Sequence, residues 1–120
     1  MVHSDLVLKY FHEHTHDGAM SRNDPAVAFA EIGRVDQHNL LCLYVRFHQG
    51  KITEAKFQAY ASVLATACCE YICGWLVGKT ADEIKLDAEH LKTALKLSNT
   101  QMHDAILVVR LVEKVLEQKP

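Results

Sequence analysis

Apolar and polar residues alternate most regularly over residues 41–48, which predicts a β-strand. One face carries the large apolar residues, which are Leu41, Leu43, Val45 and Phe47. Gln49-Gly50-Lys51 is typical of a hairpin turn, so residues 52–60 are expected to return antiparallel to the first strand. These segments predict a β-hairpin at the centre of the chain.

Two more elements are predicted before this hairpin. Residues 26–35 fit a third strand, with Val27 and Phe29 on one face. Near the start of the chain, Ser4 is a suitable N-cap for a helix whose apolar stripe includes Val7 and Tyr10. The first half of the chain should therefore form one helix and a three-stranded meander.

The period changes shortly after residue 60. From Leu64 to Leu76 apolar residues recur every three or four positions, and small or apolar residues fill most of the remaining face. Such a helix is apolar nearly all round and is expected to be buried. Gly78 should end it, and Thr80 with Glu83 forms a capping box that starts another short helix.

Two helices are predicted after the buried one. The first covers residues 87–97, and a second capping box, Ser98 with Gln101, starts the last helix near Asn99. The apolar stripe of this last helix is expected to include Ile106 and Val109. The order of elements predicts an α+β fold in which helices pack on one face of a three-stranded antiparallel sheet, with residues 1–120 as a single domain.

Composition and charge exclude several classes of function. The 13 basic residues are spread along a chain of net charge −2, which argues against nucleic-acid binding. The longest apolar stretch contains Glu70 and is too short to cross a bilayer, so no membrane association is expected. The first residues lack the pattern of a signal peptide, which favours a cytoplasmic location.

The chain has four cysteines, and in a reducing compartment they are expected to be thiols rather than disulfides. Cys68, Cys69 and Cys73 fall within the predicted buried helix, where small thiols commonly serve as packing residues. No pairing of a nucleophile with a base and no pair of carboxylates stands out, so catalytic activity is not expected.

The central segment resembles the NifU/IscU-type iron-sulfur cluster assembly scaffolds. The resemblance is carried by Phe57-Gln58-Ala59-Tyr60 and by Trp75-Leu76-Val77-Gly78-Lys79-Thr80, which match without a gap. Further matches are Ser4-Asp5, Gly50-Lys51-Ile52 and Met102-His103. The resemblance covers nearly the whole chain and implies the fold of the NifU/IscU N-terminal domain.

The same resemblance implies where cluster ligands would lie. Members of this family hold a cluster or a zinc ion with three cysteines and often an aspartate. In this chain these four positions fall on Gln37, Asn39, Ser62 and Asp104, so the three cluster cysteines are replaced. Because iron-sulfur clusters need soft thiolate ligands, the chain is expected to act as an adaptor or regulator that holds no thiolate-ligated cluster. Its expected partners are cysteine desulfurase or other cluster-assembly proteins.

A metal-binding variant is the alternative. His103 and Asp104, with His38, could bind zinc or iron through nitrogen and oxygen, whereas the simpler interpretation makes them polar surface residues. The residues themselves establish no cofactor. His12, His14 and His16 suggest a second metal site, with a solvated helix end and a partner contact as the other interpretations.

Overall fold

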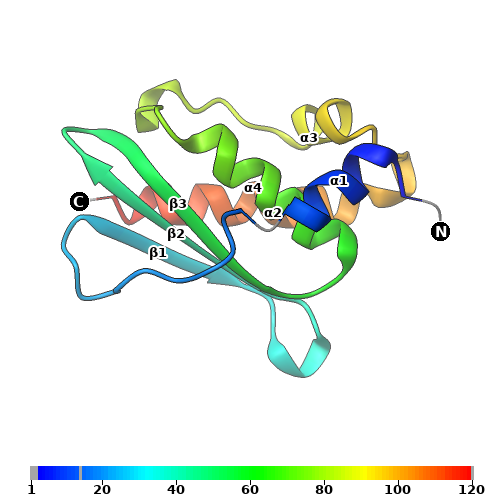
Figure 1. Cartoon of the computed structure of the whole chain (residues 1–120), viewed down its shortest axis with the longest axis horizontal. Helices are drawn as coiled ribbons and strands as arrows, with labels where there is room; N and C mark the ends of the chain where they lie inside the picture. Colours follow the sequence, from blue (N-terminus) through cyan, green and yellow to red (C-terminus); the bar gives the residue numbers. More distant parts are fainter. Residues whose placement is uncertain (1–2, 14, 120) are drawn as a thin grey trace.

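The computed structural model describes residues 3–13 and 15–119. Figure 1 shows helices and strands gathered around one three-stranded sheet. The elements are α1 (Asp5–Glu13), β1 (Val27–Ile32), β2 (Leu40–His48), β3 (Lys51–Tyr60), α2 (Val63–Leu76), α3 (Ala88–Leu95) and α4 (Met102–Glu117). Three short 3₁₀ turns, Val35–Gln37, Ala81–Glu83 and Asn99–Gln101, connect them.

The sheet has the order β1-β2-β3, and both neighbouring pairs are antiparallel. The two-residue turn at Gln49 and Gly50, which both have positive φ, joins β2 to β3 as predicted. Helices α2 and α4 pack against each other and against the same face of the sheet, α2 over β3 and α4 over β1 and β2. This arrangement confirms the predicted α+β fold class.

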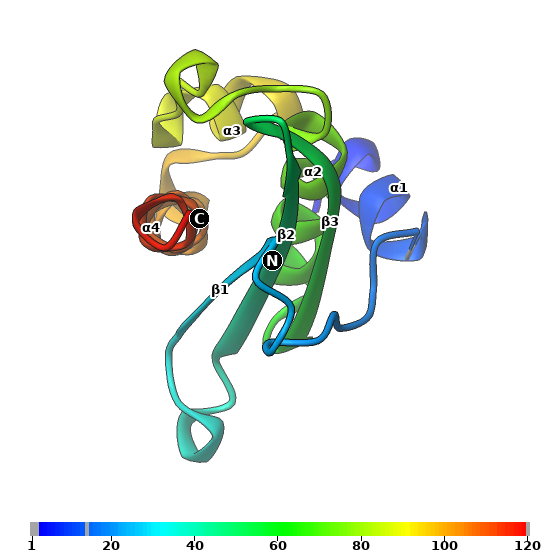
Figure 2. The ribbon, with the colours of Figure 1, turned by 90° about the vertical axis from the view of Figure 1, so that its left-hand side faces the viewer.

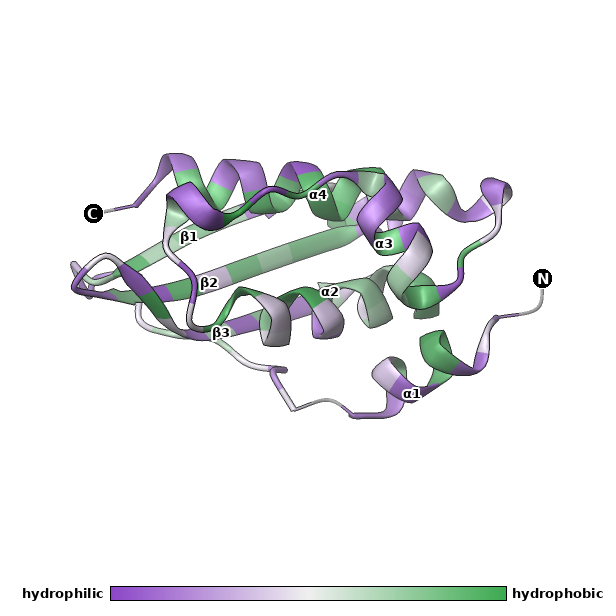
Figure 3. Cartoon of the chain, turned by 90° about the horizontal axis from the view of Figure 1, so that it is seen from above, coloured by the Kyte–Doolittle hydropathy of each residue, from purple (hydrophilic) through white to green (hydrophobic). Residues whose placement is uncertain are grey.

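The core lies between this sheet face and the two helices. In Figure 3, β2 is apolar along most of its length, whereas α4 alternates between apolar and polar segments. The side chains of β2 and β3 that face the helices are almost fully buried, and they are Leu41, Leu43, Val45, Ala55 and Phe57. Burial of this apolar surface supplies most of the stabilising free energy of such a fold.

The two faces of β1 divide as the alternation predicted, and the face of small residues is the one that packs on the core. Ala28 and Ala30 face the helices and are buried, while Val27 and Phe29 lie on the opposite face. The small alanines allow α4 to approach β1 closely, which a face of large side chains would prevent. The strand also ends at Ile32, earlier than predicted, because Gly33 turns the chain with a positive φ of 92°.

The helix boundaries follow the predicted caps with two differences. Both capping boxes form, and the Ser4 hydroxyl accepts a hydrogen bond from the Val7 amide. The Thr80 box, however, starts only a single 3₁₀ turn. In α4 the predicted stripe is confirmed at Val109, whereas Ile106 is 42% exposed and Ala105 and Val108 are buried in its place.

Long polar side chains cover the opposite face of the sheet. The Arg22 guanidinium lies 3.9 Å from the centre of the Phe29 ring, and the Tyr44 hydroxyl donates a hydrogen bond to Gln58. Arg46 forms ion pairs with both Asp24 and Glu54. This cover leaves Tyr44 only 6% exposed.

Two short segments cover parts of the free edge of β3. The carbonyl of His16 accepts a hydrogen bond from the Phe57 amide, and the Gly18 amide donates to the Phe57 carbonyl, both at 2.9 Å. Residues 78–80 pair with the start of β3 in the same way, through the amide and carbonyl of Ile52. The edge is therefore less available for pairing with another chain.

The helices of the described part of the chain are all too short or too polar to cross a membrane.

Candidate functional site

Ser62 and Asp104 form the centre of the candidate metal corner, which we define as Ser62, His103 and Asp104. Ser62 lies in the turn between β3 and α2, where its hydroxyl caps α2 by accepting a hydrogen bond from the Ala65 amide at 3.0 Å. The same hydroxyl donates to Oδ2 of Asp104 at 3.1 Å. Asp104 lies in the first turn of α4, where a carboxylate interacts favourably with the helix dipole. The two positions thus satisfy each other.

A pocket of about 250 Å³ opens at this corner. It is lined by His3, Ser62, Leu64, Thr100, Gln101, His103 and Asp104. The Nδ1 atom of His3 is buried and has no hydrogen-bond partner among the described residues, which is unusual for an imidazole nitrogen. Sequence reasoning missed His3, because nothing in its immediate neighbourhood indicates that the start of the chain returns to this corner.

The loop between β1 and β2 holds the other predicted site residues, Gln37, His38 and Asn39. It projects away from the rest of the molecule in Figure 1 and Figure 2. The Asn39 side-chain oxygen accepts a hydrogen bond from the Arg34 amide at 2.9 Å, and the His38 ring lies 5.0 Å from that of Tyr60. None of the three lines the pocket at the candidate metal corner, so the structure brings His103 and Asp104 to one pocket but places His38 outside it.

The loop is closed tightly by its own residues. Gly33 lies so near Asn39 that an added Cβ would stand 1.8 Å from the Asn39 carbonyl oxygen, and the positive φ of Gly33 is one that glycine adopts readily. An ion pair between Arg34 and Asp36 bridges the exposed side. The side chain of Asn39 is therefore used in holding the loop, not in facing the corner.

Residues 2–118 match the family model described as the NifU-like N terminal domain, which is nearly the full chain. The chain belongs to the NifU-like N-terminal domain family.

Relatives of this NifU-like chain agree with that assignment. It is 24% identical over 106 residues to the iron-sulfur cluster assembly protein IscU of Plasmodium falciparum, a match that covers 88% of the chain and 65% of that relative. The chain thus spans just under two thirds of the relative's length.

Solved structures share the fold of the NifU-like chain. A candidate iron-sulfur cluster assembly scaffold protein for the SUF system from Fervidobacterium islandicum AW-1 has a TM-score of 0.71 and 17% identity, over 94% of this chain and 95% of the other. The N-terminal part of a nitrogen-fixing NifU-like protein from Brucella abortus has a TM-score of 0.58 and 15% identity, over 96% and 94%. At these identities the likeness shows the fold alone.

All four thiols of this NifU-like domain are buried. Cys68, Cys69 and Cys73 lie on α2 inside the core, and Cys42 lies on β2. Burial raises the pKa of Cys68 to about 12, and it raises the pKa of Cys69 and Cys73 further above the usual value. The pKa of Cys42 is raised by burial and by the neighbouring Glu31 carboxylate. Protonated thiols in a core are poor metal ligands and poor nucleophiles.

The residues present do not fit a thiolate-ligated cluster. The candidate metal corner offers a hydroxyl, an imidazole and a carboxylate, while the soft ligands are in the helix core. In the described part of the chain, no group of three or more His, Cys, Asp or Glu side chains is arranged to hold a metal ion.

The histidine-rich segment after α1 is only partly described. His12 lies in the last turn of α1 with its ring 5.3 Å from that of Phe11, and His14 lies outside the described residues. His16 instead contacts the buried Glu70 of α2, with its Nδ1 atom 2.5 Å from a carboxylate oxygen. His12 and His16 therefore have different neighbours.

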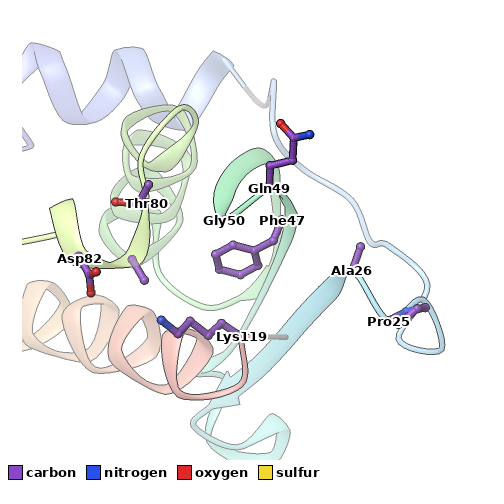
Figure 4. A pocket seen from close by; sticks show the side chains of 9 residues that line it. Pro25, Ala26, Phe47, Gln49, Gly50, Thr80, Asp82 and Lys119 are labelled. Carbon is purple, nitrogen blue, oxygen red and sulfur yellow. The ribbon is translucent and has the colours of Figure 1, made fainter.

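A larger cavity of about 630 Å³ lies beside the β2–β3 turn and the end of α4. Figure 4 shows the Phe47 ring at its centre, with Thr80 and Asp82 on one side and Lys119 below. It contains none of the residues of the candidate metal corner.

Proposed function

We propose that this chain is a scaffold-like protein of iron-sulfur cluster assembly that acts as an adaptor or regulator and does not itself hold a thiolate-ligated cluster. The observation that carries the proposal is the hydrogen bond between Ser62 and Asp104. Two positions that the family resemblance assigns to ligands are here occupied by oxygen groups that bind each other. A cluster at this corner would have to break that bond without gaining any sulfur ligand.

The other two assigned positions support the same proposal. Asn39 uses its side-chain oxygen to hold the loop, and Gln37 lies in an exposed 3₁₀ turn. Neither side chain is a soft ligand. The four cysteines offer no replacement, because moving a thiol from the middle of α2 to a loop would unfold the helix.

As an adaptor, the chain would act by binding other assembly proteins in the cytoplasm and would catalyse no reaction. A cysteine desulfurase is the partner that fits first, since the relative from Plasmodium falciparum is itself described as a protein of iron-sulfur cluster assembly. The fold shared with scaffold proteins would keep a surface that partners can bind, while the altered corner would remove the site that holds a cluster.

The test combines binding with reconstitution. Purified chain and purified cysteine desulfurase from the same source should form a complex in calorimetry or analytical gel filtration. The same mixture, supplied with iron, cysteine and a reductant, should leave the chain without the visible absorbance of a cluster. Absence of any complex with the desulfurase and with other assembly proteins would contradict the adaptor role, and a cluster that stays with the chain would contradict the altered-site argument.

A second candidate function is zinc or iron binding at the candidate metal corner. The unpartnered Nδ1 of His3 favours it, because His3, His103 and Asp104 line one pocket. The three side chains are not arranged as a ligand set in this structure, so metal binding would have to draw the two imidazoles and the carboxylate together. Under this alternative, Asp104→Asn should weaken zinc binding strongly while keeping an acceptor for the Ser62 hydroxyl. His38→Gln is the matched control, since that ring lies outside the pocket. Equal zinc binding in the wild type and D104N would remove the corner as a metal site.

A further inference from the structure

Glu70 is a buried carboxylate in an otherwise apolar part of α2. It is only 2% exposed, and both of its oxygens accept hydrogen bonds from His16. The His16 backbone amide donates to Oε1 at 2.9 Å, and the His16 ring contacts Oε2 through Nδ1 at 2.5 Å. Burying a carboxylate is costly unless it is paired in this way, so the pair fixes His16 against α2.

The contact favours one tautomer of a neutral His16 ring. Opposite an ionised Glu70 carboxylate, which only accepts hydrogen bonds, a neutral imidazole donates through Nδ1. In the neutral ring, Nε2 then keeps its lone pair, and no hydrogen bond from the described residues reaches this atom. A histidine that gives one N–H to a carboxylate and keeps the other nitrogen bare has the arrangement of a metal-ligating imidazole.

The His16 ring opens onto a pocket of about 280 Å³ between α1 and α2. The backbone of His16 also holds the ring in place, because the His16 carbonyl accepts a hydrogen bond from the Phe57 amide of β3. The pocket is also lined by Tyr10, Glu13, Tyr71 and Trp75. Glu13 is 37% exposed and makes only a 3.8 Å contact with the exposed Lys9, so its carboxylate remains available. An imidazole and a carboxylate thus line the same pocket.

We propose that His16, through Nε2, and Glu13 bind a divalent first-row metal ion such as Zn²⁺ or Fe²⁺, with Glu70 orienting the imidazole from behind. Imidazole nitrogen with carboxylate oxygen suits these ions. Solvent completes the coordination, so the site is open and has two protein ligands. It is separate from the candidate metal corner and does not depend on the proposed function.

The arrangement also distinguishes this site from a purely structural pair. A structural pair needs the contact between Glu70 and His16 but has no use for a second carboxylate, that of Glu13, in the same pocket. The metal site uses all three groups, and each makes a different contribution. Loss of His16 removes a ligand, whereas loss of the Glu70 charge leaves the ligand and removes its orientation.

The experiment is a titration of tag-free protein with Co²⁺, followed by its visible absorbance, and then displacement by Zn²⁺. One equivalent should bind to the wild type. His16→Gln should abolish this binding, and Glu70→Gln should weaken it about 10- to 100-fold, as expected for loss of a carboxylate behind a ligating histidine. His48→Gln, at the exposed end of β2, is the matched control, and it should leave the affinity unchanged.

Folding is checked separately, because Glu70→Gln alters a buried group. Glu13→Gln changes only an exposed side chain, so it should keep the wild-type melting temperature and still weaken Co²⁺ binding at least tenfold. Equal Co²⁺ affinity in H16Q and the wild type would overturn the proposal, as would equal affinity in E13Q. Loss of binding in H103Q with no change in H16Q would assign the metal to the candidate metal corner instead.

Discussion

The candidate metal corner and the middle of α2 contain opposite kinds of metal-ligand chemistry. The corner has a hydroxyl, an imidazole and a carboxylate at element ends beside an open pocket. The middle of α2 has three thiols, each at most 2% exposed and surrounded by core side chains. The soft thiols are therefore enclosed in the core, and the groups beside the pocket are oxygen and nitrogen ligands.

The difference teaches that the number of cysteines in a chain does not give the number of thiols that a metal can reach. Cys68, Cys69 and Cys73 contribute to the core as small apolar residues, and burial keeps their pKa values high. Ser62 contributes to the corner as a helix cap. In both regions the side chains contribute to the stability of the fold.

The largest effect is expected from α2 itself. Ile72 is 1% exposed on α2, so Ile72→Ala should lower the free energy of unfolding by about 2 to 5 kcal/mol through lost burial and a residual cavity. Urea unfolding measures the change. Lys85→Ala, at an exposed position, is the control and should change stability by less than about 0.5 kcal/mol. A small loss in I72A would mean that α2 is a looser, more accessible helix than described.

The next prediction concerns the reactivity of the thiols. With its pKa raised to about 12, Cys68 should carry about 10⁻⁴ thiolate at pH 8, against about 0.2 for an ordinary thiol. Labelling of native protein at the α2 cysteines should therefore be about a thousandfold slower than in urea, where all four thiols react. Rapid native labelling at Cys68 or Cys73 would break the contrast with the corner, because it would make these thiols available to a metal.

The same raised pKa values predict a loss of stability in alkali. A buried thiol stays protonated up to its raised pKa, whereas the unfolded chain loses that proton above about 8.5. The contribution is thus complete below that value and falls by about 1.4 kcal/mol per pH unit per thiol as the pH rises toward 12. Urea unfolding at pH 8 and pH 10 tests it. Cys68→Ala should show a shallower decline, and an unchanged slope would contradict the assigned burial.

The smallest expected effect is at the corner. Ser62→Ala removes the hydroxyl that caps α2 and contacts Asp104, and it should cost about 1 kcal/mol of stability. Ser62→Thr keeps a capping hydroxyl and should cost less. Thermal unfolding compares the two. If S62A were as stable as the wild type, the hydroxyl would not serve as a cap, and a ligand role for this position would gain weight.

Much of the fold could be predicted from local pattern. The alternation over β2 places Leu41 and Leu43 correctly on the core face, and Gly78 has the positive φ expected after the end of α2. Both capping boxes form where the sequence indicated them. Each of these features depends on residues only a few positions apart, which is the range that sequence patterns report.

The features that local pattern does not determine are those that tertiary contacts decide. The alanine face of β1 is buried because α4 packs close to it, and alanines give no strand signal of their own. Several rows of apolar residues run along α4, so its sequence does not select between Ile106 and Val108 as the inward position. The chain alone also cannot show that Glu70 meets His16, 54 positions earlier.

The candidate site was partly predictable. The resemblance indicated Ser62 and Asp104, and the structure brings them into one hydrogen bond. It also indicated Asn39 and its neighbour His38, whose places are set by the closure of their loop and by Tyr60. His3 was not anticipated, since its place in the pocket depends on how the first residues pack against distant elements.

The most direct test of the central claim is elemental analysis with an absorbance spectrum of tag-free protein purified anaerobically from iron-supplemented cells. The account predicts no acid-labile sulfide and no visible absorbance of a cluster. Iron or zinc without sulfide would agree with the oxygen and nitrogen sites described above. Stoichiometric iron together with sulfide would contradict the claim, because the chain would then hold a cluster without the thiolates at its loops.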